Sequence, residues 1–350
     1  MNVSAFLESL SSQATATFPP QTSAVAQAVL QGLSANPKYL PSWLFYDAEG
    51  SRLFEAITRL PEYYLTHLEQ SIFVRHAECM IAVAAGLKRE HLSVLELGAG
   101  SASKTIILLR ALIARQGRVT YIPVDVSEAA LQWARRNVHS ALPEVQVQPI
   151  RSEFTHERSL HLPEKDRKLA LYIGSSIGNF DSAEAVELLR WLRAQLKHGD
   201  ALLLGTDMVK PVPPMLAAYN DAAGITAAFN KNILVRINRE LGANFAVEAF
   251  QHRAIWNPAE SRIEMHLDST RNQTVHVAAL NRSFDFRAGE SIHTENSRKF
   301  TLESVEEILE KSGFELERSW FDENFWFGVH LARAVETAAM PDEDAEEQAA

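Results

Sequence analysis

From about residue 90 onward, short apolar runs alternate with stretches in which apolar residues recur at helical spacing. The apolar runs predict strands at 93–97, 119–124, 145–150, 169–173 and 201–204. Near-continuous apolar strands that alternate with amphipathic helices are typical of a parallel sheet covered on both faces. The pattern therefore predicts an α/β fold.

Capping residues indicate where several of the helices begin and end. Ser103 is the predicted N-cap of the helix after the first strand, and the next helix is predicted over 127–142. Asp181 and Glu184 have the spacing of a capping box, and Gly199 is predicted to end that helix. These signals place helices after the first, second and fourth strands.

The last part of the chain leaves this parallel pattern. Thr301 is the predicted N-cap of a helix that runs through Leu309 and stops at Gly313. Two apolar runs follow, 314–321 and 325–331, with only three residues between them. Because a connection this short joins antiparallel neighbours, we expect a terminal antiparallel hairpin.

The region between the fifth strand and this last helix has a different pattern of apolar and polar residues. Helical segments around 214–241 give way to alternating stretches such as 263–267 and 274–280, and Asn257-Pro258 marks a turn. We therefore expect an α+β insertion in the sheet domain. The predicted divisions are an N-terminal helical segment (1–67), the sheet domain (68–209 and 300–334), the insertion (210–299) and a tail (335–350).

Composition and charge narrow the classes of partner. The 350 residues are 46% hydrophobic and 22% charged, a globular balance with room for about two domains. The formal net charge of −10 argues against nucleic acid as the main partner, because phosphate binding needs a basic surface. The tail carries six acids and no base, so we expect it to be disordered and solubilising.

The sequence shows no signal for export or for a membrane anchor. No Lys or Arg precedes Lys38, which argues against a secretory or transit signal, and the uncharged stretch 9–37 is polar and broken by Pro19-Pro20. The single cysteine, Cys79, excludes an intramolecular disulfide and a cysteine-based zinc cluster. We therefore expect a cytoplasmic protein with no membrane partner. No obvious interface stripe is visible, so we expect a monomer.

Two glycines at the end of the first strand indicate a ligand site. Gly98 and Gly100 let the backbone approach a ligand closely, and Asp125 ends the second strand, where an acid can accept both ribose hydroxyls. The third glycine of a dinucleotide fingerprint is absent, which argues against a pyrophosphate and a nicotinamide cofactor. S-adenosylmethionine has no phosphate, so this pattern favours it. A tight strand-to-helix turn is the alternative explanation for the glycines.

Residues near the next strand ends extend this candidate site. Glu153-Phe154 stands where an acid can face the adenine amino group, with a solvated loop acid as the alternative. Lys104 can meet the cofactor's carboxylate or lie on the helix surface. Gly174 to Asn179 follows the fourth strand. Its glycines let backbone carbonyls reach an amine, and an Asn amide can bind a carboxylate.

Other kinds of chemistry find less support. The 12 histidines include no helical His-x3-His pair with an attendant acid, so we expect no metal, and no Gly-x-Ser-x-Gly elbow is present. Paired aromatics such as Tyr63-Tyr64 are usually core residues. Glu295 and Ser297 alternate on a possible strand, and taken alone they favour a solvated edge.

Several spaced blocks across residues 36–333 together resemble the histidine-specific methyltransferases of ergothioneine biosynthesis. The blocks are Trp43-Leu-Phe-Tyr-Asp47, Leu60-Pro-Glu-Tyr-Tyr64, Glu96-Leu-Gly-Ala-Gly100, Gly174-Ser-Ser-Ile-Gly-Asn179, Gly205-Thr-Asp207, 218–230, Arg262-Ile-Glu-Met265 and Glu295-Asn-Ser-Arg-Lys-Phe300. The resemblance implies a class I methyltransferase (Rossmann-like) fold with a substrate-binding insertion. It also implies Nα-trimethylation of L-histidine to hercynine, with S-adenosylmethionine as the methyl donor.

The resemblance implies a role for each candidate residue at its own position. The implied cofactor residues are Gly98, Lys104, Asp125, Glu153 and Phe154, beside Gly100 of the same loop. The implied contacts to the substrate's carboxylate and amine come from Asn179, Tyr219, Tyr63 and the Gly174 carbonyl, with Tyr46 and Phe54 nearby. Of these, Tyr63, Gly174 and Asn179 are the catalytic candidates. The implied imidazole contacts are Glu295, Ser297 and Met265.

The chain departs from the family's pattern at two positions. Glu153 stands where the family usually has Asp, and its longer side chain can still reach an adenine amine. Leu65 stands where proline is common, and we expect this change to be neutral.

Two alternatives remain at this point. One is an enzyme of the same fold that methylates another amine, such as a tryptophan-derived one. Glu295 and Ser297 argue against it, because an indole pocket favours apolar residues. The other is a cofactor-binding module without catalysis. It would need a degraded site, yet every implied position holds a competent residue.

Overall fold

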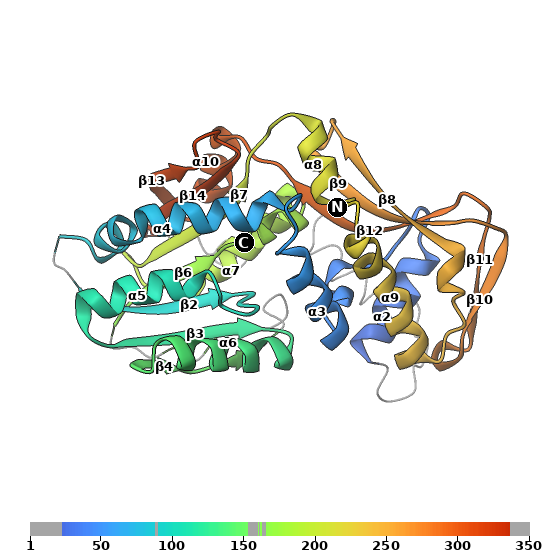
Figure 1. Ribbon diagram of the computed structural model, residues 1–350, viewed down its shortest axis with the longest axis horizontal. Helices are drawn as coiled ribbons and strands as arrows, with labels where there is room; N and C mark the ends of the chain where they lie inside the picture. Colours follow the sequence, from blue (N-terminus) through green and yellow to red (C-terminus); the bar gives the residue numbers. More distant parts are fainter. Residues whose placement is uncertain (1–22, 88–89, 153–159, 161, 163–165, 337–350) are drawn as a thin grey trace, which may run out of the picture.

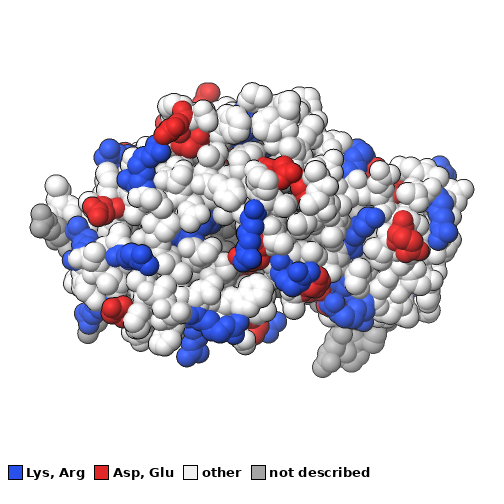
Figure 2. Space-filling view, in the orientation of Figure 1, with Lys and Arg blue, Asp and Glu red and all other residues white. Residues whose placement is uncertain are grey.

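The computed structural model describes residues 23–87, 90–152, 160, 162 and 166–336. Its two parts lie side by side, a large sheet with its helices and a smaller part built around a second sheet (Figure 1). Helix α3 (Ala48–Ile57) lies where the two parts meet (Figure 1). Acidic and basic side chains are interspersed among uncharged ones on the face shown in Figure 2.

The large sheet has eight strands, in the order β13-β14-β7-β6-β2-β3-β4, with β5 beside β3. Their bounds are β2 Leu92–Leu97, β3 Val119–Asp125, β4 Val145–Val147, β5 Ile150–Arg151, β6 Arg167–Tyr172, β7 Ala201–Asp207, β13 Phe314–Phe321 and β14 Phe327–Ala334. The strands from β7 to β4 pair in parallel, whereas β14 is antiparallel to both β7 and β13. The predicted parallel sheet and terminal hairpin are both confirmed.

Helices cover both faces of this sheet because alternate strand residues face opposite ways. In β7, Ala201 and Leu203 pack into one core while Leu202 and Leu204 pack into the other. The first core also holds residues of three helices, α4 (Tyr64–Ala85), α5 (Thr105–Gln116) and α6 (Glu128–Ala141). The second holds residues of α7 (Ser182–Ala194) and α10 (Leu302–Lys311).

Three local predictions about this part need correction. The predicted strand 145–150 is split into β4 and β5, with Pro149, which has no N–H to donate, between them. Ser103 does not cap α5, which begins at Thr105, and the Thr105 hydroxyl bonds Glu96 instead. Helix α7 ends at Ala194 before Gly199, because Lys197 and Asp200 form a turn there.

The two predicted N-caps at the start of α7 and α10 are confirmed. Asp181 accepts hydrogen bonds from the backbone N–H groups of Ala183 and Glu184, and the reciprocal bond completes a capping box. Thr301 caps α10 in the same way, with Ser304 as its partner.

The smaller part contains a four-stranded sheet, a separate hairpin and two helices. The four-stranded sheet has the order β1-β12-β9-β8. The bounds are β1 Lys38–Tyr39, α8 Val212–Ala218, α9 Ile225–Leu241, β8 Phe250–Asn257, β9 Arg262–Ser269, β10 Gln273–Val277, β11 Arg282–Phe286 and β12 Ser291–Arg298. The hairpin is β10-β11, and β1 joins the N-terminal segment to this sheet by pairing in parallel with β12.

The N-terminal segment, which includes α2 (Ala24–Ser34), packs on the smaller part of the molecule. Asp47 is the N-cap of α3 and accepts a hydrogen bond of 2.7 Å from Gly50 N–H. The same carboxylate is bonded by two side chains of α9, Asn232 at 2.9 Å and Arg239 at 2.7 Å. One acid thus starts α3 and fixes it against α9. No described helix is long and apolar enough to cross a membrane.

Replacement of Asp47 tests this anchor. We expect Asp47→Ala to lower the free energy of unfolding by about 1–3 kcal/mol, because the cap and the bond from Asn232 are both lost. Asp47→Asn keeps a capping oxygen and loses only the half-exposed ion pair with Arg239, so we expect a loss below about 1 kcal/mol. Urea denaturation measures both values. Equal losses in the two variants would assign the effect to the ion pair and contradict the anchor.

Candidate active site

The glycine loop after β2 leaves open space at the carboxyl edge of the large sheet. Gly98 and Gly100 have φ values of +66° and +51°, and a Cβ built on either would meet no atom within 4 Å. Asp125, at the end of β3, accepts hydrogen bonds from Gly100 N–H at 3.1 Å and from Ser127 N–H at 2.8 Å. Burial raises the pKa of Asp125, and these N–H groups oppose the shift. The loop and the acid therefore stand together, with room beside them for a ligand.

Lys104, one of the predicted cofactor-binding residues, already has a partner within the protein. Lys104 is ion-paired with Glu69, a fully buried acid of α4, rather than lying free on the helix surface. The other oxygen of Glu69 accepts a 2.8 Å hydrogen bond from Gly174 N–H. Glu69 thus joins a cofactor candidate to a substrate candidate. Glu153 and Phe154 lie outside the described residues.

Sequence reasoning missed Glu69, although a signal was present. Within α4, Glu69 occupies the same buried face as Leu65, Ile72 and Phe73. An acid in such an apolar stripe needs a partner, which here comes from two other elements. The space for its carboxylate exists because residue 205 is glycine, and a Cβ there would collide with Glu69.

A pocket lies where α4, the loop after β6, α8 and the second sheet meet. It is lined by all eight predicted substrate-binding residues, Tyr46, Phe54, Tyr63, Asn179, Tyr219, Met265, Glu295 and Ser297. Gly174 lines it too, together with residues that the sequence did not single out, among them Thr226 and Phe229. The fold therefore brings the predicted set together from stretches spread between residues 46 and 297.

One wall of the pocket is aromatic. Ring centroids are 5.9 Å apart for Tyr46 and Phe54, 6.2 Å for Phe54 and Tyr63, and 6.2 Å for Tyr63 and Tyr219. Burial raises the phenol pKa values of all three tyrosines well above the ordinary value. The phenols therefore stay protonated and neutral, and the wall offers π faces and hydroxyls to a cationic group.

The other wall is polar and comes from β9 and β12. Glu295 pairs with Met265 across the two strands, and no described residue donates a hydrogen bond to the Glu295 carboxylate. Burial raises the pKa of Glu295 to about 8, and Lys299 opposes the shift. The Ser297 hydroxyl lies 2.5 Å from the Tyr219 hydroxyl. Glu295 and Ser297 are thus on a pocket wall, and the solvated edge suggested by the residues alone is wrong.

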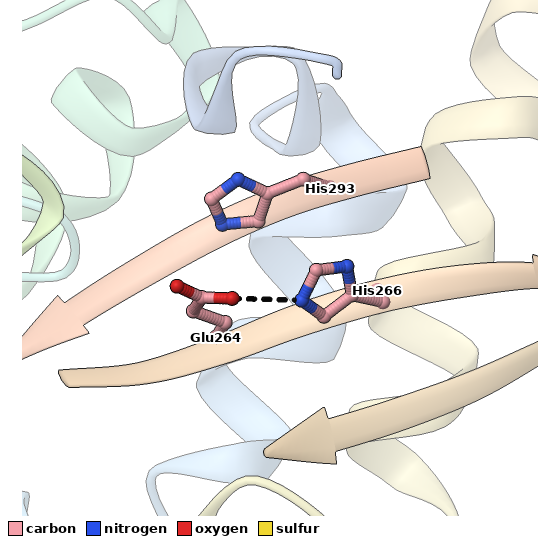
Figure 3. A group of neighbouring side chains, drawn as sticks. All are labelled: Glu264, His266 and His293. Carbon is pink, nitrogen blue, oxygen red and sulfur yellow. Dashed lines mark hydrogen bonds and ion pairs between the residues drawn. The ribbon is translucent and has the colours of Figure 1, made fainter. Parts of the chain in front are cut away.

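Glu264, His266 and His293 gather on the same two strands (Figure 3). The centroids of the two imidazoles are 4.9 Å apart and their planes lie 22° from parallel, and the candidate ligand atoms of the three residues lie within 4.8 Å of one another. His293 Nε2 donates to the Glu295 carbonyl, and His266 Nε2 lies 3.0 Å from Glu264.

Glu264 is already compensated without a metal. Burial alone would raise its pKa, but hydrogen bonds from Asn257, Arg262 and His266 lower it to about 2. The residues next to Glu264 and His266 in β9 include Met265, which points into the pocket. Since successive side chains of a strand alternate between faces, Glu264 and His266 lie on the reverse face of the sheet. A register shift between His293 and Glu295 places His293 opposite His266, so the whole group lies on that face. It takes no part in the pocket.

The strand order, the antiparallel terminal hairpin and the glycine loop followed by an acid at the end of β3 define the class of S-adenosylmethionine-dependent methyltransferases with a Rossmann-like sheet. The family model described as "Histidine-specific methyltransferase, SAM-dependent" matches residues 25–334. The chain belongs to this family.

Curated relatives agree with this membership. The chain is 42% identical over 310 residues to the histidine N-alpha-methyltransferase of Mycolicibacterium smegmatis, covering 88% of this chain and 94% of that one. The enzyme of the same name from Mycobacterium tuberculosis is 41% identical, with the same coverage. Ergothioneine biosynthesis protein 1 of Neurospora crassa is 31% identical over 302 residues, which cover 84% of this chain and 33% of that protein.

The raised pKa of Glu295 has a measurable consequence for stability. Between the ordinary carboxyl pKa and about 8, the folded state holds a proton that the unfolded state has lost, so rising pH destabilises the fold. We expect the stability of the wild type relative to Glu295→Gln to fall between about pH 5 and pH 8, by at most about 1.4 kcal/mol per pH unit. Urea denaturation at three pH values tests this. A constant difference between the two proteins would refute the raised pKa.

Proposed function

We propose that this protein transfers three methyl groups in succession from S-adenosylmethionine to the α-amino nitrogen of L-histidine, giving hercynine, the first step of ergothioneine biosynthesis. The observation that carries the proposal is the single pocket lined by all eight predicted substrate-binding residues, in a chain of this family. Because one chain supplies the whole set, we further propose that the enzyme acts as a monomer.

The glycine loop is the proposed cofactor site. Gly98 and Gly100 leave room for a ligand, since their Cβ positions are open, and Asp125 stands where ribose hydroxyls would bond. The Lys104 ammonium would lie near the carboxylate of S-adenosylmethionine, while Glu69 balances its charge. The bound cofactor supplies the sulfonium methyl group.

The substrate's backbone groups would bind between α4 and the loop after β6. Asn179 would donate to the carboxylate with the Tyr219 ring beside it, and Tyr63 with the Gly174 carbonyl would hold the α-amine. An amine attacks a sulfonium methyl in line, so the protein mainly aligns and desolvates the two reactants. Lys104 lies close to Gly174, since a Cβ at Gly174 would be 3.3 Å from its Nζ. This proximity supports an amine site beside the cofactor site.

The amine must lose a proton before each transfer. Because burial raises the pKa of Tyr63 well above its ordinary value, its phenol does not act as a phenolate base. We propose that in the first two transfers the neutral phenol accepts a hydrogen bond from the amine and turns the nitrogen lone pair toward the methyl group. The dimethylated nitrogen has no N–H once it has lost its proton, so in the third transfer the aromatic wall alone would orient it. The aromatic wall would then stabilise the growing cation by about 0.5–2 kcal/mol per contact.

The imidazole would bind at the polar wall. Glu295 would accept the ring N–H, Ser297 would bond the ring, and Met265 would pack against it. An indole has an N–H but no second nitrogen, so it would leave one of these buried polar groups unpaired, which disfavours a tryptophan-derived substrate.

Mass spectrometry tests the substrate and the number of transfers together. Purified protein is incubated with S-adenosylmethionine and an equimolar mixture of amino acids. We expect a single product, histidine that carries three methyl groups on its α-nitrogen, with the singly and doubly methylated forms as intermediates. Methylation of another amine with histidine unchanged would overturn the pocket assignment and keep the methyltransferase class. An absence of any transfer would favour a binding module.

Glu295→Ala tests the imidazole contact. We expect calorimetry at pH 9, above the Glu295 pKa of about 8, to show histidine binding weakened about 10- to 100-fold, the cost of losing a hydrogen bond to a charged group, with binding of S-adenosylhomocysteine nearly unchanged. Glu295→Gln keeps an acceptor oxygen and serves as the matched control, with a smaller loss. Equal weakening of the cofactor would show that Glu295 supports the whole site rather than the ring.

A further inference from the structure

A fully buried lysine lies directly behind the polar wall of the pocket. The Lys299 Nζ is 2.7 Å from Asp207 Oδ2, 2.7 Å from Ser297 Oγ and 3.3 Å from the Tyr219 hydroxyl. An ammonium has three hydrogen-bond donors and no acceptor. Lys299 therefore has one partner for each donor, a carboxylate and two hydroxyls that line the pocket.

These contacts determine which hydrogen bonds the two hydroxyls can still donate. Ser297 Oγ and the Tyr219 oxygen each accept from Lys299, and they lie 2.5 Å apart, so one of them donates to the other. The pair carries two protons, and the bond between them uses one. The second proton has no acceptor within the pair. It is therefore available to a ligand in the pocket.

We propose that Lys299 is a positioning residue that makes the Ser297–Tyr219 pair the proton-donating side of the ring site, complementary to the accepting carboxylate of Glu295. The proposal rests on the proposed function, which places the histidine ring at this wall. A neutral imidazole has one N–H and one bare nitrogen, so a site with one acceptor and one donor satisfies both. A ring without the bare nitrogen leaves the donated proton unpaired.

Charge supports the same arrangement. Lys299 lowers the pKa of Glu295 against the effect of burial, which favours the ionised, accepting form of that carboxylate. The ammonium also lies 4.7 Å from the centroid of the Tyr219 ring, a cation–π contact that keeps the phenol over Lys299. The lysine therefore acts on the donor pair through hydrogen bonds and on the acceptor through its charge.

A second buried lysine provides a matched control. Lys210 is ion-paired with the other oxygen of Asp207, and its Nζ lies 3.0 Å from the Tyr64 hydroxyl. Among the described residues, no hydrogen bond joins Lys210 to Ser297 or Tyr219. Loss of either lysine removes one positive charge beside Asp207. Only loss of Lys299 removes the N–H groups that donate to the Ser297 and Tyr219 hydroxyls.

The test compares ligand preference in Lys299→Met and Lys210→Met by calorimetry with S-adenosylhomocysteine present. The ligands are L-histidine and two pyrrolylalanine isomers, which keep the ring N–H at either position and lack the bare nitrogen. We expect the wild type to prefer histidine at least about tenfold. We expect Lys299→Met to weaken histidine binding about tenfold, leave pyrrolylalanine binding within about twofold, and so abolish the preference. Lys210→Met should keep it.

The outcomes separate the two proposals. An unchanged preference in Lys299→Met, while the wild type still methylates histidine, overturns the role of Lys299 and leaves the proposed function standing. A wild type that methylates histidine but does not prefer it to the pyrrolylalanines overturns the role of Lys299, whereas a wild type that does not methylate histidine overturns the proposed function on which that role rests. If Lys299→Met does not fold, Ser297→Ala, which removes one of the two hydroxyls that Lys299 binds, is compared in the same way, and a preference that survives in Ser297→Ala overturns the donor role of the pair.

Discussion

A buried ion pair holds the two sheets of this protein together. Asp207 is the last residue of β7, its side chain is fully buried, and it pairs with both Lys210 and Lys299. Backbone bonds reinforce the junction, since Phe300 N–H donates to the Asp207 carbonyl and Val209 N–H donates to Phe300. The chain leaves the large sheet and returns to it at this point. Removing one charge from such a buried group costs about 3–5 kcal/mol, so the junction is held firmly.

The pocket takes its chemical character from this junction. Tyr219 and Ser297 contact Lys299, while Ser175, beside Gly174, accepts a 2.8 Å hydrogen bond from the Asp207 N–H. Residues at both ends of the pocket are thus tied to Asp207, one end through its carboxylate and the other through its backbone N–H. The aromatic wall faces this polar end without carrying charge, because burial keeps its phenols protonated. Such a pocket suits a substrate with an amine at one end and a polar ring at the other.

Much of the large sheet could be predicted from sequence because its strands are buried on both faces and read as continuous apolar runs. Boundaries were less predictable where a single residue changed the backbone, as Pro149 does between β4 and β5. The substrate residues required a family resemblance, since Glu295 and Ser297 alone resemble a solvated edge. Lys299 and Glu69 escaped notice because an isolated charge does not reveal partners that lie far away in the sequence.

The pairing of β1 with β12 has a consequence for how the protein folds. Lys38 and Glu290, which close this pairing by an ion pair, are 252 residues apart, and the aromatic and polar walls are separated by a similar length of chain. The large sheet contains many neighbouring βαβ units that can form from local contacts, whereas the pocket requires closure of nearly the whole chain. The binding site is therefore among the last features to form during synthesis, and a partly made chain has a sheet before it has a pocket.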